Sequence, residues 1–370
     1  MNIPFIDLKA QFGALEPAIR GRIDAVLAHG QYIMGPEVAE LESALATFVG
    51  DGRHCVTCAS GTEGLLMALM ALGIGPGDEV ITTPFTFAAT GEVIALVGAT
   101  PVWVDVRSSD ALLDERQIAA AITPRTRAIM PVSLYGQMAD MAAIDAIAAE
   151  HGLPVIEDAA QSFGAQYRGR RSCGVSTIGV TSFFPSKPLG CYGDGGAIFT
   201  ADESLAQALR EIRVHGQSKR YVHTRIGVGG RMDTLQCAIV LAKFERFAQE
   251  VTDRANISAR YLEAFEDLEP DLTRISVAPD RTSVWGQFTV RVGDRESFVA
   301  ALKDAGVPTA VHYPVPLNAQ PAYLPFGGLN STPVAQRLAD EVVSLPMSAD
   351  LSVEQQNYII STVRRFFGKA

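Results

Sequence analysis

The sequence predicts an α/β protein in which a large domain, built on a mostly parallel sheet with helices on both faces, precedes a smaller α+β domain. Strand-like and helical patterns alternate from residue 55 onward, which is the first observation behind this prediction. The strand-like runs are apolar, as in strands that are buried on both faces. Small or polar residues follow several of these runs, where a parallel sheet binds its ligands.

Size and composition agree with such a fold. The chain has 370 residues, of which 48% are hydrophobic and 19% charged, so it buries a large core and is not disordered. We place the large domain at residues 1–245 and the small one at 246–370. The formal net charge is −10 and no basic block is present, which argues against nucleic acid or an anionic membrane as a partner.

The compartment is predicted from the N-terminus and the cysteines. Residues 1–17 lack a basic segment followed by an apolar one, and no run approaches the roughly 18 apolar residues of a membrane-spanning helix. Five cysteines do not make a disulfide framework. A CxxC pair, Cys55 and Cys58, has no second pair at zinc-site spacing, and we interpret it as part of a buried strand. We expect a cytoplasmic protein without a metal.

The large domain begins with two helices, because apolar residues recur at helical spacing over residues 15–29 and 37–49. The alternating region then supplies strands and helices in turn. The predicted strands are 55–59, 79–82, 102–106, 128–133, 155–157, 177–184 and 197–200, and the helices are 61–72, 86–97, 139–151 and 205–213.

The remaining elements connect and build the small domain. Residues 233–264 form two helices or one long bent helix between the domains. The predicted elements beyond it are a strand at 284–292, a helix at 295–305, a short strand at 309–312 and helical patterns at 340–345 and 353–367.

Lys187 is the strongest candidate for chemistry. It stands in a Ser-Lys-Pro turn after an apolar strand-like run, and Pro188 disfavours helical geometry at the lysine. The glycines within residues 190–196 leave room beside the amine. An amine held at a strand end beside open space suits a covalent bond to an aldehyde cofactor.

Two further strand ends fit the same cofactor. Asp158 follows the buried run 154–157, so its carboxylate is placed to pair with a pyridinium nitrogen, although it could instead cap the next turn. Ser60, Gly61 and Thr62 lie between a strand and a helix, where free N–H groups bind an anion or the side chains simply cap the helix.

Other candidates stay open on the residues alone. Phe87 stacks on a flat ring or packs in the core, and Ser182 or Ser186 donates to a phosphate or is solvated. His312 and Arg231 serve a site or are structural. No GxGxxG opens a strand–helix unit and no Walker-type loop is present.

Several motifs together resemble the pyridoxal 5'-phosphate (PLP) dependent nucleotide-sugar aminotransferases of the DegT/StrS class. Residues 157–162 read EDAAQS and residues 182–190 read SFFPSKPLG. Supporting matches are FIDL at 5–8, GT at 61–62, GDGG at 193–196, HG at 215–216 and HYP at 312–314. Within this class the chain is most similar to bacterial enzymes that act on UDP-2-acetamido-2-deoxy-3-oxo-glucuronate, on the way to a lipopolysaccharide O-antigen sugar.

The resemblance implies the aspartate-aminotransferase fold type I, with a seven-stranded type of sheet, and a homodimer with active sites at its interface. Lys187 would bond to the cofactor and later move a proton. Asp158 would pair with the ring nitrogen, Gln161 would contact the ring hydroxyl and Phe87 would stack on the ring. The implied phosphate ligands are Gly61, Thr62 and Ser182, and the implied substrate contacts are Gly30, Tyr32, Ser186, Arg231, His312 and Tyr313.

The resemblance therefore predicts transamination of a UDP-linked 3-keto sugar, with glutamate as the amino donor. The alternatives are another keto-sugar nucleotide, such as a dTDP- or GDP-linked 4-keto-6-deoxyhexose, or a non-catalytic regulatory protein of the same fold. The sequence departs from the class at Gly229, where many members carry an asparagine that reaches the phosphate of the partner subunit's cofactor.

Overall fold

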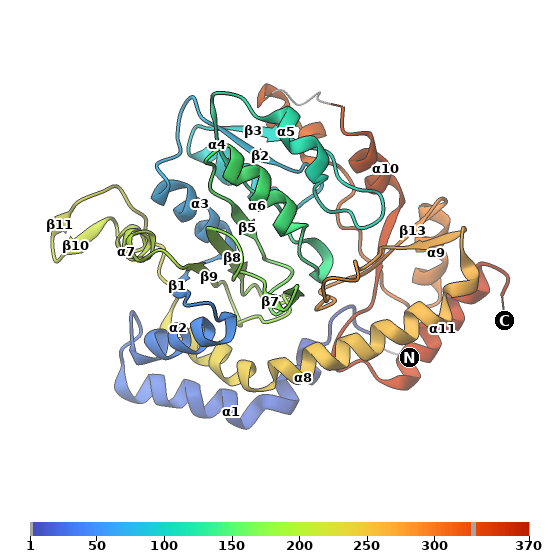
Figure 1. Ribbon diagram of the computed structural model, residues 1–370. Coiled ribbons are helices and arrows are strands. Elements are labelled where there is room, and N and C mark those ends of the chain that lie inside the picture. Colours follow the sequence, from blue (N-terminus) through green and yellow to red (C-terminus); the bar gives the residue numbers. More distant parts are fainter. Residues whose placement is uncertain (1–2, 327–330, 370) are drawn as a thin grey trace.

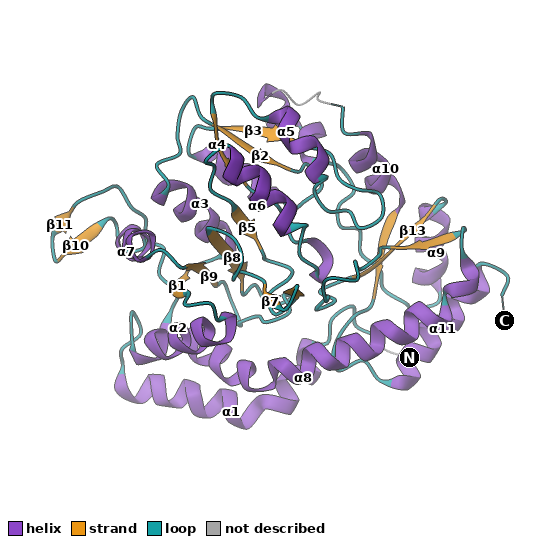
Figure 2. Cartoon of the chain, viewed as in Figure 1, coloured by secondary structure: helices purple, strands orange, loops and turns teal. Residues whose placement is uncertain are grey.

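The computed structural model describes residues 3–326 and 331–369 and shows a helix-covered sheet joined by one long helix to a smaller antiparallel sheet (Figures 1 and 2). Strands β3, β2 and β4 pair in parallel. Bridges from Ile129 to Val155 and from Val132 to Asp158 join them to the group β5, β8, β9 and β1. Only β9 runs against its neighbours in this sheet. The strand bounds are β1 (His54–Cys58), β2 (Glu79–Thr82), β3 (Thr100–Trp103), β4 (Thr126–Ile129), β5 (Ile156–Asp158), β8 (Ile178–Ser182) and β9 (Gly196–Thr200).

Helices cover both faces of this sheet, so side chains of alternate strand residues enter two different cores. Val56 and Ile198 pack with residues of α3 and α7 on one face. Cys55 and Phe199 pack with residues of α2 and α8 on the other. The helices of the large sheet are α1 (Leu8–His29), α2 (Pro36–Val49), α3 (Gly61–Ala71), α4 (Ala88–Leu96), α5 (Ile118–Ala121), α6 (Met141–Glu150) and α7 (Glu203–Ile212). The predicted, mostly parallel α/β architecture is confirmed.

Local sequence explains where several helices begin. The hydroxyl of Ser60 accepts from the backbone N–H of Glu63 at the start of α3. Asp140 and Asp202 cap α6 and α7 in the same way. Both cysteines of the CxxC pair are buried in β1, as the strand interpretation predicts.

The helix α8 (Thr234–Ala264) connects two separate cores. Its first half places Val240 and Phe247 in the core beneath the large sheet, and its second half places Ile257 and Tyr261 in the core of the small domain. It is continuous over 31 residues, which decides between the two predicted forms. The predicted domain boundary, after residue 245, falls inside this helix.

The C-terminal part contains an antiparallel sheet in the order β12-β13-β14. Helices α9 and α11 supply Phe298 and Ile359 to its core. Among the described residues, no helix is both long and apolar enough to cross a membrane. The bounds are β12 (Leu272–Arg274), β13 (Phe288–Val292), β14 (Val342–Leu345), α9 (Arg295–Asp304), α10 (Pro333–Glu341) and α11 (Val353–Phe366).

Two predictions in this region are wrong. The pattern at 340–345 predicts a helix, but α10 ends at Glu341 and residues 342–345 form β14. Val343 pairs with Val290 across the sheet, and this partner overrides a six-residue pattern that fits either structure. The predicted strand at 309–312 is reduced to a single bridge between Ala310 and Ser344.

Candidate active site

A cavity of about 460 Å³ lies at the carboxyl edge of the parallel strands. Residues that directly follow β1, β5 and β8 line it, together with the loop after β2 and two segments of the small domain. This is the edge at which the sequence predicted the ligand site. The lining residues used below are Ser60, Gly61, Thr62, Thr86, Phe87, Asp158, Gln161, Ser182, Phe184, Ser186, Lys187, Asp194, Gln287, His312 and Tyr313.

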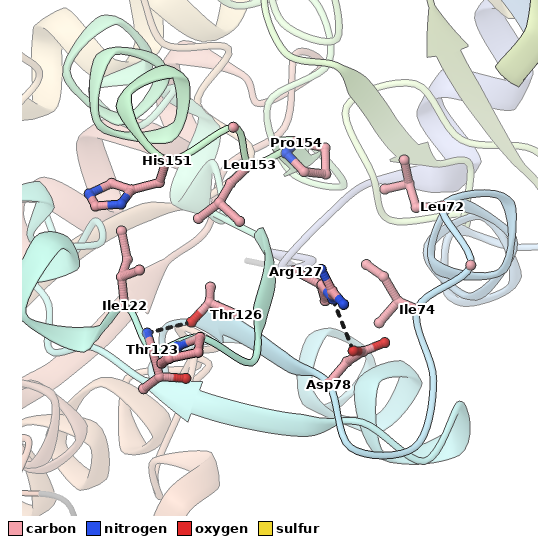
Figure 3. Close-up of a pocket in the computed structure, with 13 residues that line it drawn as sticks. Leu72, Ile74, Asp78, Ile122, Thr123, Thr126, Arg127, His151, Leu153 and Pro154 are labelled. Carbon is pink, nitrogen blue, oxygen red and sulfur yellow. Dashed lines mark hydrogen bonds and ion pairs between the residues drawn. The ribbon is translucent and has the colours of Figure 1, made fainter.

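A second cavity, of about 570 Å³, lies at the opposite edge of the sheet (Figure 3). It is lined by residues that precede β2, β4 and β5. Here Arg127 Nε already donates to Asp78 Oδ1 at 3.2 Å, and the Thr123 N–H donates to Thr126 Oγ1 at 2.9 Å. The cavity is remote from Lys187 and Asp158, so we place the candidate active site at the carboxyl edge.

The turn that carries Lys187 is held on both sides. The Lys187 N–H donates to the carbonyl of Phe184 at 2.8 Å. The buried Arg254 donates to the carbonyl of Pro188 at 3.2 Å. A Cβ at Gly190 would lie 2.6 Å from the Phe184 carbonyl oxygen, so this fold of the turn requires glycine. Burial lowers the pKa of the Lys187 amine, and the charge of Asp158 opposes this shift. The lowered pKa increases the unprotonated, nucleophilic fraction of the amine.

Asp158 is the last residue of β5, and it pairs with Val180 of β8, the strand that leads to Lys187. Its carboxylate accepts from Thr90 Oγ1 at 2.8 Å and from the Ala160 N–H at 3.2 Å. Burial raises the pKa of the Asp158 carboxyl, while these two hydrogen bonds and the charge of Lys187 oppose the rise. Asp158 and Lys187 thus line one cavity from adjacent strands, as the sequence predicted.

The preceding residue, Glu157, fixes the strand end from behind. Its fully buried carboxylate accepts from the hydroxyls of Ser133 and Ser172 and from the Cys173 N–H. Because these donors come from two separate segments, Ser133 after β4 and the pair Ser172–Cys173, the end of β5 is held in place on the side away from the cavity.

The first turn of α3 forms an anion cradle. The first N–H groups of a helix have no partner inside it, and those of α3 begin at Gly61 and Thr62. A Cβ at Gly61 would lie 2.7 Å from Ser182 Cβ, so glycine lets the helix start directly against the end of β8. Ser182 Oγ accepts from the Phe184 N–H at 3.2 Å, which leaves its hydroxyl hydrogen available. These residues suit a phosphate.

Gln161 is oriented by two partners. Its Oε1 accepts from the Tyr135 N–H at 2.9 Å, and its Nε2 donates to the Tyr313 hydroxyl at 3.0 Å. The Tyr135 hydroxyl in turn donates to the carbonyl of His312. Burial, followed by the charge of Lys187, lowers the pKa of His312 to about 4, so its ring is neutral near pH 7.

Phe87 is exposed for 56% of its surface and lies beside the cavity, which rules out the core interpretation. Its ring centroid is 6.2 Å from that of Tyr313. Ser186 also lines the cavity, one residue before Lys187.

Three candidates lie outside this cavity. Gly30 ends α1 in the left-handed conformation and donates to the Val26 carbonyl. Tyr32 is 48% exposed and its carbonyl accepts from the Thr234 N–H at 3.0 Å. Arg231 is half-buried, close in sequence to Thr234, and forms no hydrogen bond or ion pair within the described part of the chain. The structure therefore places Tyr32 and Arg231 on adjacent segments, outside the cavity of Lys187.

Sequence reasoning missed several residues of the cavity. Thr86, next to Phe87, carries no sequence signal of a site, and Phe184 belongs to the SFFPSKPLG motif without being predicted as a site residue. Asp194 stood in the GDGG run, whose pattern was the only available signal. Gln287 comes from the small domain, and nothing in its neighbourhood in the sequence pointed to a site.

The residues of the cavity fit PLP. An amine, a buried carboxylate and a helix N-terminus face one space, matching an aldehyde, a pyridinium nitrogen and a phosphate. Gln287 Oε1 is buried without a hydrogen-bond partner in the described chain, as expected of an atom that accepts a hydrogen bond from a bound ligand.

Comparisons with known proteins agree with this chemistry. A model of the DegT/DnrJ/EryC1/StrS aminotransferase family matches residues 14–364. The chain is 56% identical, over 93% of its own length and 95% of the relative's, to the UDP-2-acetamido-2-deoxy-3-oxo-D-glucuronate aminotransferase of Pseudomonas aeruginosa.

Two solved structures extend the similarity to the whole fold. A DegT DnrJ EryC1 StrS aminotransferase from Brucella abortus superposes with a TM-score of 0.96 and 41% identity, covering 100% of both chains. The protein ntda from Bacillus subtilis, with bound cofactor PMP, has a TM-score of 0.92 and 28% identity, covering 100% of this chain and 86% of the other.

Proposed function

The chain belongs to the DegT/DnrJ/EryC1/StrS aminotransferase family, and we propose that it transfers an amino group to carbon 3 of UDP-2-acetamido-2-deoxy-3-oxo-glucuronate. The observation that carries this proposal is the shared cavity of Lys187 and Asp158, combined with the identity of the Pseudomonas aeruginosa relative.

The predictions of family, fold type and aminotransferase activity are confirmed, and PLP is the cofactor. When bound, PLP supplies an electron sink that stabilises negative charge on the carbon next to the transferred nitrogen. We propose that Asp158, Gln161, Phe87 and Lys187 hold its ring, and that Gly61, Thr62 and Ser182 hold its phosphate.

The residues of the cavity have different proposed roles in the reaction. Asp158 keeps a proton on the pyridine nitrogen by presenting a carboxylate to it. The lowered pKa of Lys187 suits its Nζ to remove a proton from the carbon that carries the amino group and to return one on the sugar side. Ser186, His312 and Tyr313 contact the sugar nucleotide from the cavity wall.

We propose that a homodimer accounts for the candidate residues outside the cavity. Tyr32 and Ile33 are exposed apolar side chains, and so are Tyr221 and Ile226 around the β10–β11 hairpin (Gln217–Lys219 and Val222–His223) that projects from the body in Figure 1. We propose that a second subunit covers these surfaces and that Gly30, Tyr32 and Arg231 reach the partner's substrate. A guanidinium without an ion pair suits the uronate carboxylate or the diphosphate.

The remaining parts of the proposal rest on the family and on composition. We propose glutamate as the donor, a role in O-antigen or lipopolysaccharide synthesis, and a cytoplasmic location, which the five free cysteines suit. We also propose that residues 1–245 and 246–370 are the two domains, because α8 passes between two cores.

The experiment is a substrate panel with the purified holoenzyme. Glutamate should bleach the visible cofactor band and the UDP-linked 3-keto uronate should restore it, with the highest kcat/KM of the panel. The competing sugars are the UDP-linked 3-keto sugar without the carboxylate and the dTDP- and GDP-linked 4-keto-6-deoxyhexoses. A higher kcat/KM for any of them would overturn the proposed substrate, and failure to turn over any amino donor would revive the regulatory alternative.

A further inference from the structure

A chain of hydroxyl groups leads from the cavity wall to the buried side of Asp158. Thr86 Oγ1 and Thr90 Oγ1 are 3.0 Å apart, and Thr90 Oγ1 is 2.8 Å from Asp158 Oδ2. Thr86 lies in the loop after β2, and Thr90 lies in the first turn of α4. All three side chains are buried. The same short segment thus carries Phe87 at the cavity and Thr90 behind the carboxylate.

The direction of this chain follows from the number of hydrogens. An ionised carboxylate only accepts, so Thr90 must give its single hydroxyl hydrogen to Asp158. Thr90 can then only accept from Thr86, which makes Thr86 the donor of the second bond. Protonation of Asp158 would reverse this order or break it. The pair of hydroxyls therefore favours the ionised form of a carboxylate that is almost removed from water.

We propose that Thr90, supported by Thr86, is the positioning residue that keeps Asp158 ionised and aimed at the pyridine nitrogen. This inference rests on the proposed role of Asp158 and adds a residue to it. Thr90 does not line the cavity, so it acts through Asp158 alone. The Ala160 N–H holds the other carboxylate oxygen, Oδ1, so the two bonds together fix the plane of the carboxylate.

The charged and titratable groups near Asp158 come from three elements. Lys187 lowers its pKa from the turn after β8. Tyr313 and Cys173 face it as neutral groups, since burial, together with the nearby carboxylates, raises the pKa of both. Removal of the Thr90 hydroxyl deletes a bond that lowers the pKa of Asp158. The pH at which cofactor binding is lost on the acid side therefore shifts upward in such a variant.

The test measures binding of pyridoxamine phosphate to the full-length apoprotein by fluorescence between pH 5.5 and 8.5, because this form of the cofactor makes no bond to Lys187. We expect Thr90→Val to weaken binding about tenfold or more at pH 7.5, since one hydrogen bond to a charged group is lost. The acid-side loss should move to higher pH. Thr90→Ser keeps the hydroxyl and should bind close to wild type.

The matched control is Thr82→Val. Thr82 is a buried threonine on β2 whose hydroxyl donates to the Met130 carbonyl at 2.8 Å and makes no bond to the Asp158 carboxylate. It should lower the melting temperature without changing cofactor affinity. If Thr90→Val does not fold, Thr86→Val decides the matter by a smaller shift in the same direction.

A comparison with Asp158→Asn distinguishes failure of the proposed role of Asp158 from failure of the proposed positioning role of Thr90. If Asp158→Asn weakens binding and Thr90→Val or Thr86→Val leaves affinity and pH profile unchanged, the positioning role is wrong and the proposed function stands. If Asp158→Asn binds the cofactor normally, the proposed role of Asp158 is wrong, and the positioning role of Thr90 is wrong with it.

Discussion

The side-chain amide of Gln161 donates to the Tyr313 hydroxyl at 3.0 Å, across 152 positions of the chain. The bond joins the edge of the large sheet to a segment of the small domain, at the wall of the cavity. Gln161 is buried, so this contact supplies the hydrogen-bond acceptor that its Nε2 needs and fixes the orientation of the side-chain amide.

The Gln161–Tyr313 bond predicts the effect of Tyr313→Phe. The change leaves a buried N–H without a partner, and we expect the free energy of unfolding to fall by about 1 to 2 kcal/mol and the cofactor to bind more weakly. Tyr358→Phe removes a similar bond, to the Ala305 carbonyl at 2.9 Å, far from the cavity. It should cost stability alone. Urea unfolding and cofactor titration measure both, and equal cofactor affinity in the two variants would contradict the prediction.

Lys187→Ala is expected to lower the turnover number about 10³-fold or more, because the base that moves the proton is lost. The circular dichroism spectrum should be unchanged. Lys303→Ala, at an exposed position of α9, should keep wild-type turnover. Full activity of Lys187→Ala would show that another group carries the chemistry.

Arg231→Gln tests the proposed substrate carboxylate. We expect kcat/KM for the uronate to fall about 10- to 100-fold through KM, since a charge-assisted pair is lost. The 3-keto sugar without the carboxylate should be affected much less. Arg337→Gln, on the exposed face of α10, serves as the control. An equal loss for both sugars would assign Arg231 to the diphosphate instead.

Gly61→Ala places a Cβ 2.7 Å from Ser182 Cβ, so the start of α3 or the end of β8 must move. We expect the free energy of unfolding to fall by about 1 to 3 kcal/mol and the affinity for the cofactor phosphate to fall with it. Gly21→Ala, inside α1 with open space around the new Cβ, should instead stabilise by about 0.5 to 1 kcal/mol. A neutral Gly61→Ala would mean that the two elements are not in close contact.

His312 predicts a pH dependence of stability. Its pKa is lowered from 6.5 to about 4 in the folded protein, so below pH 6.5 the unfolded chain binds a proton that the folded one does not. The part of the free energy of unfolding that depends on a neutral His312 is fully present above pH 6.5. It is lost as the pH falls toward 4, by on the order of 3 kcal/mol. His312→Gln should flatten this part of the curve in urea unfolding, whereas His151→Gln, at an exposed site, should not. Parallel curves for all three proteins would contradict the shifted pKa.

The sequence by itself determined the alternation of strands and helices in the large domain, the family, the cofactor and the positions of Lys187, Asp158 and Gly61 at strand ends. The positions at strand ends follow from local sequence signals. A parallel sheet brings the carboxyl ends of its strands to one edge, independently of how the rest of the chain packs. The roles of the individual site residues stay predictions.

Tertiary structure alone decided which distant groups meet there. Thr90 reaches Asp158 across 68 positions, and Gln287 enters the cavity from the small domain. Residues 342–345 became a strand because β13 offers them a partner, although their local pattern had suggested a helix. The segments that carry Tyr32 and Arg231 came together outside the cavity of Lys187. In each case the deciding contact joins segments far apart in sequence, so the local pattern carries no information about it, and packing of the folded chain selects it.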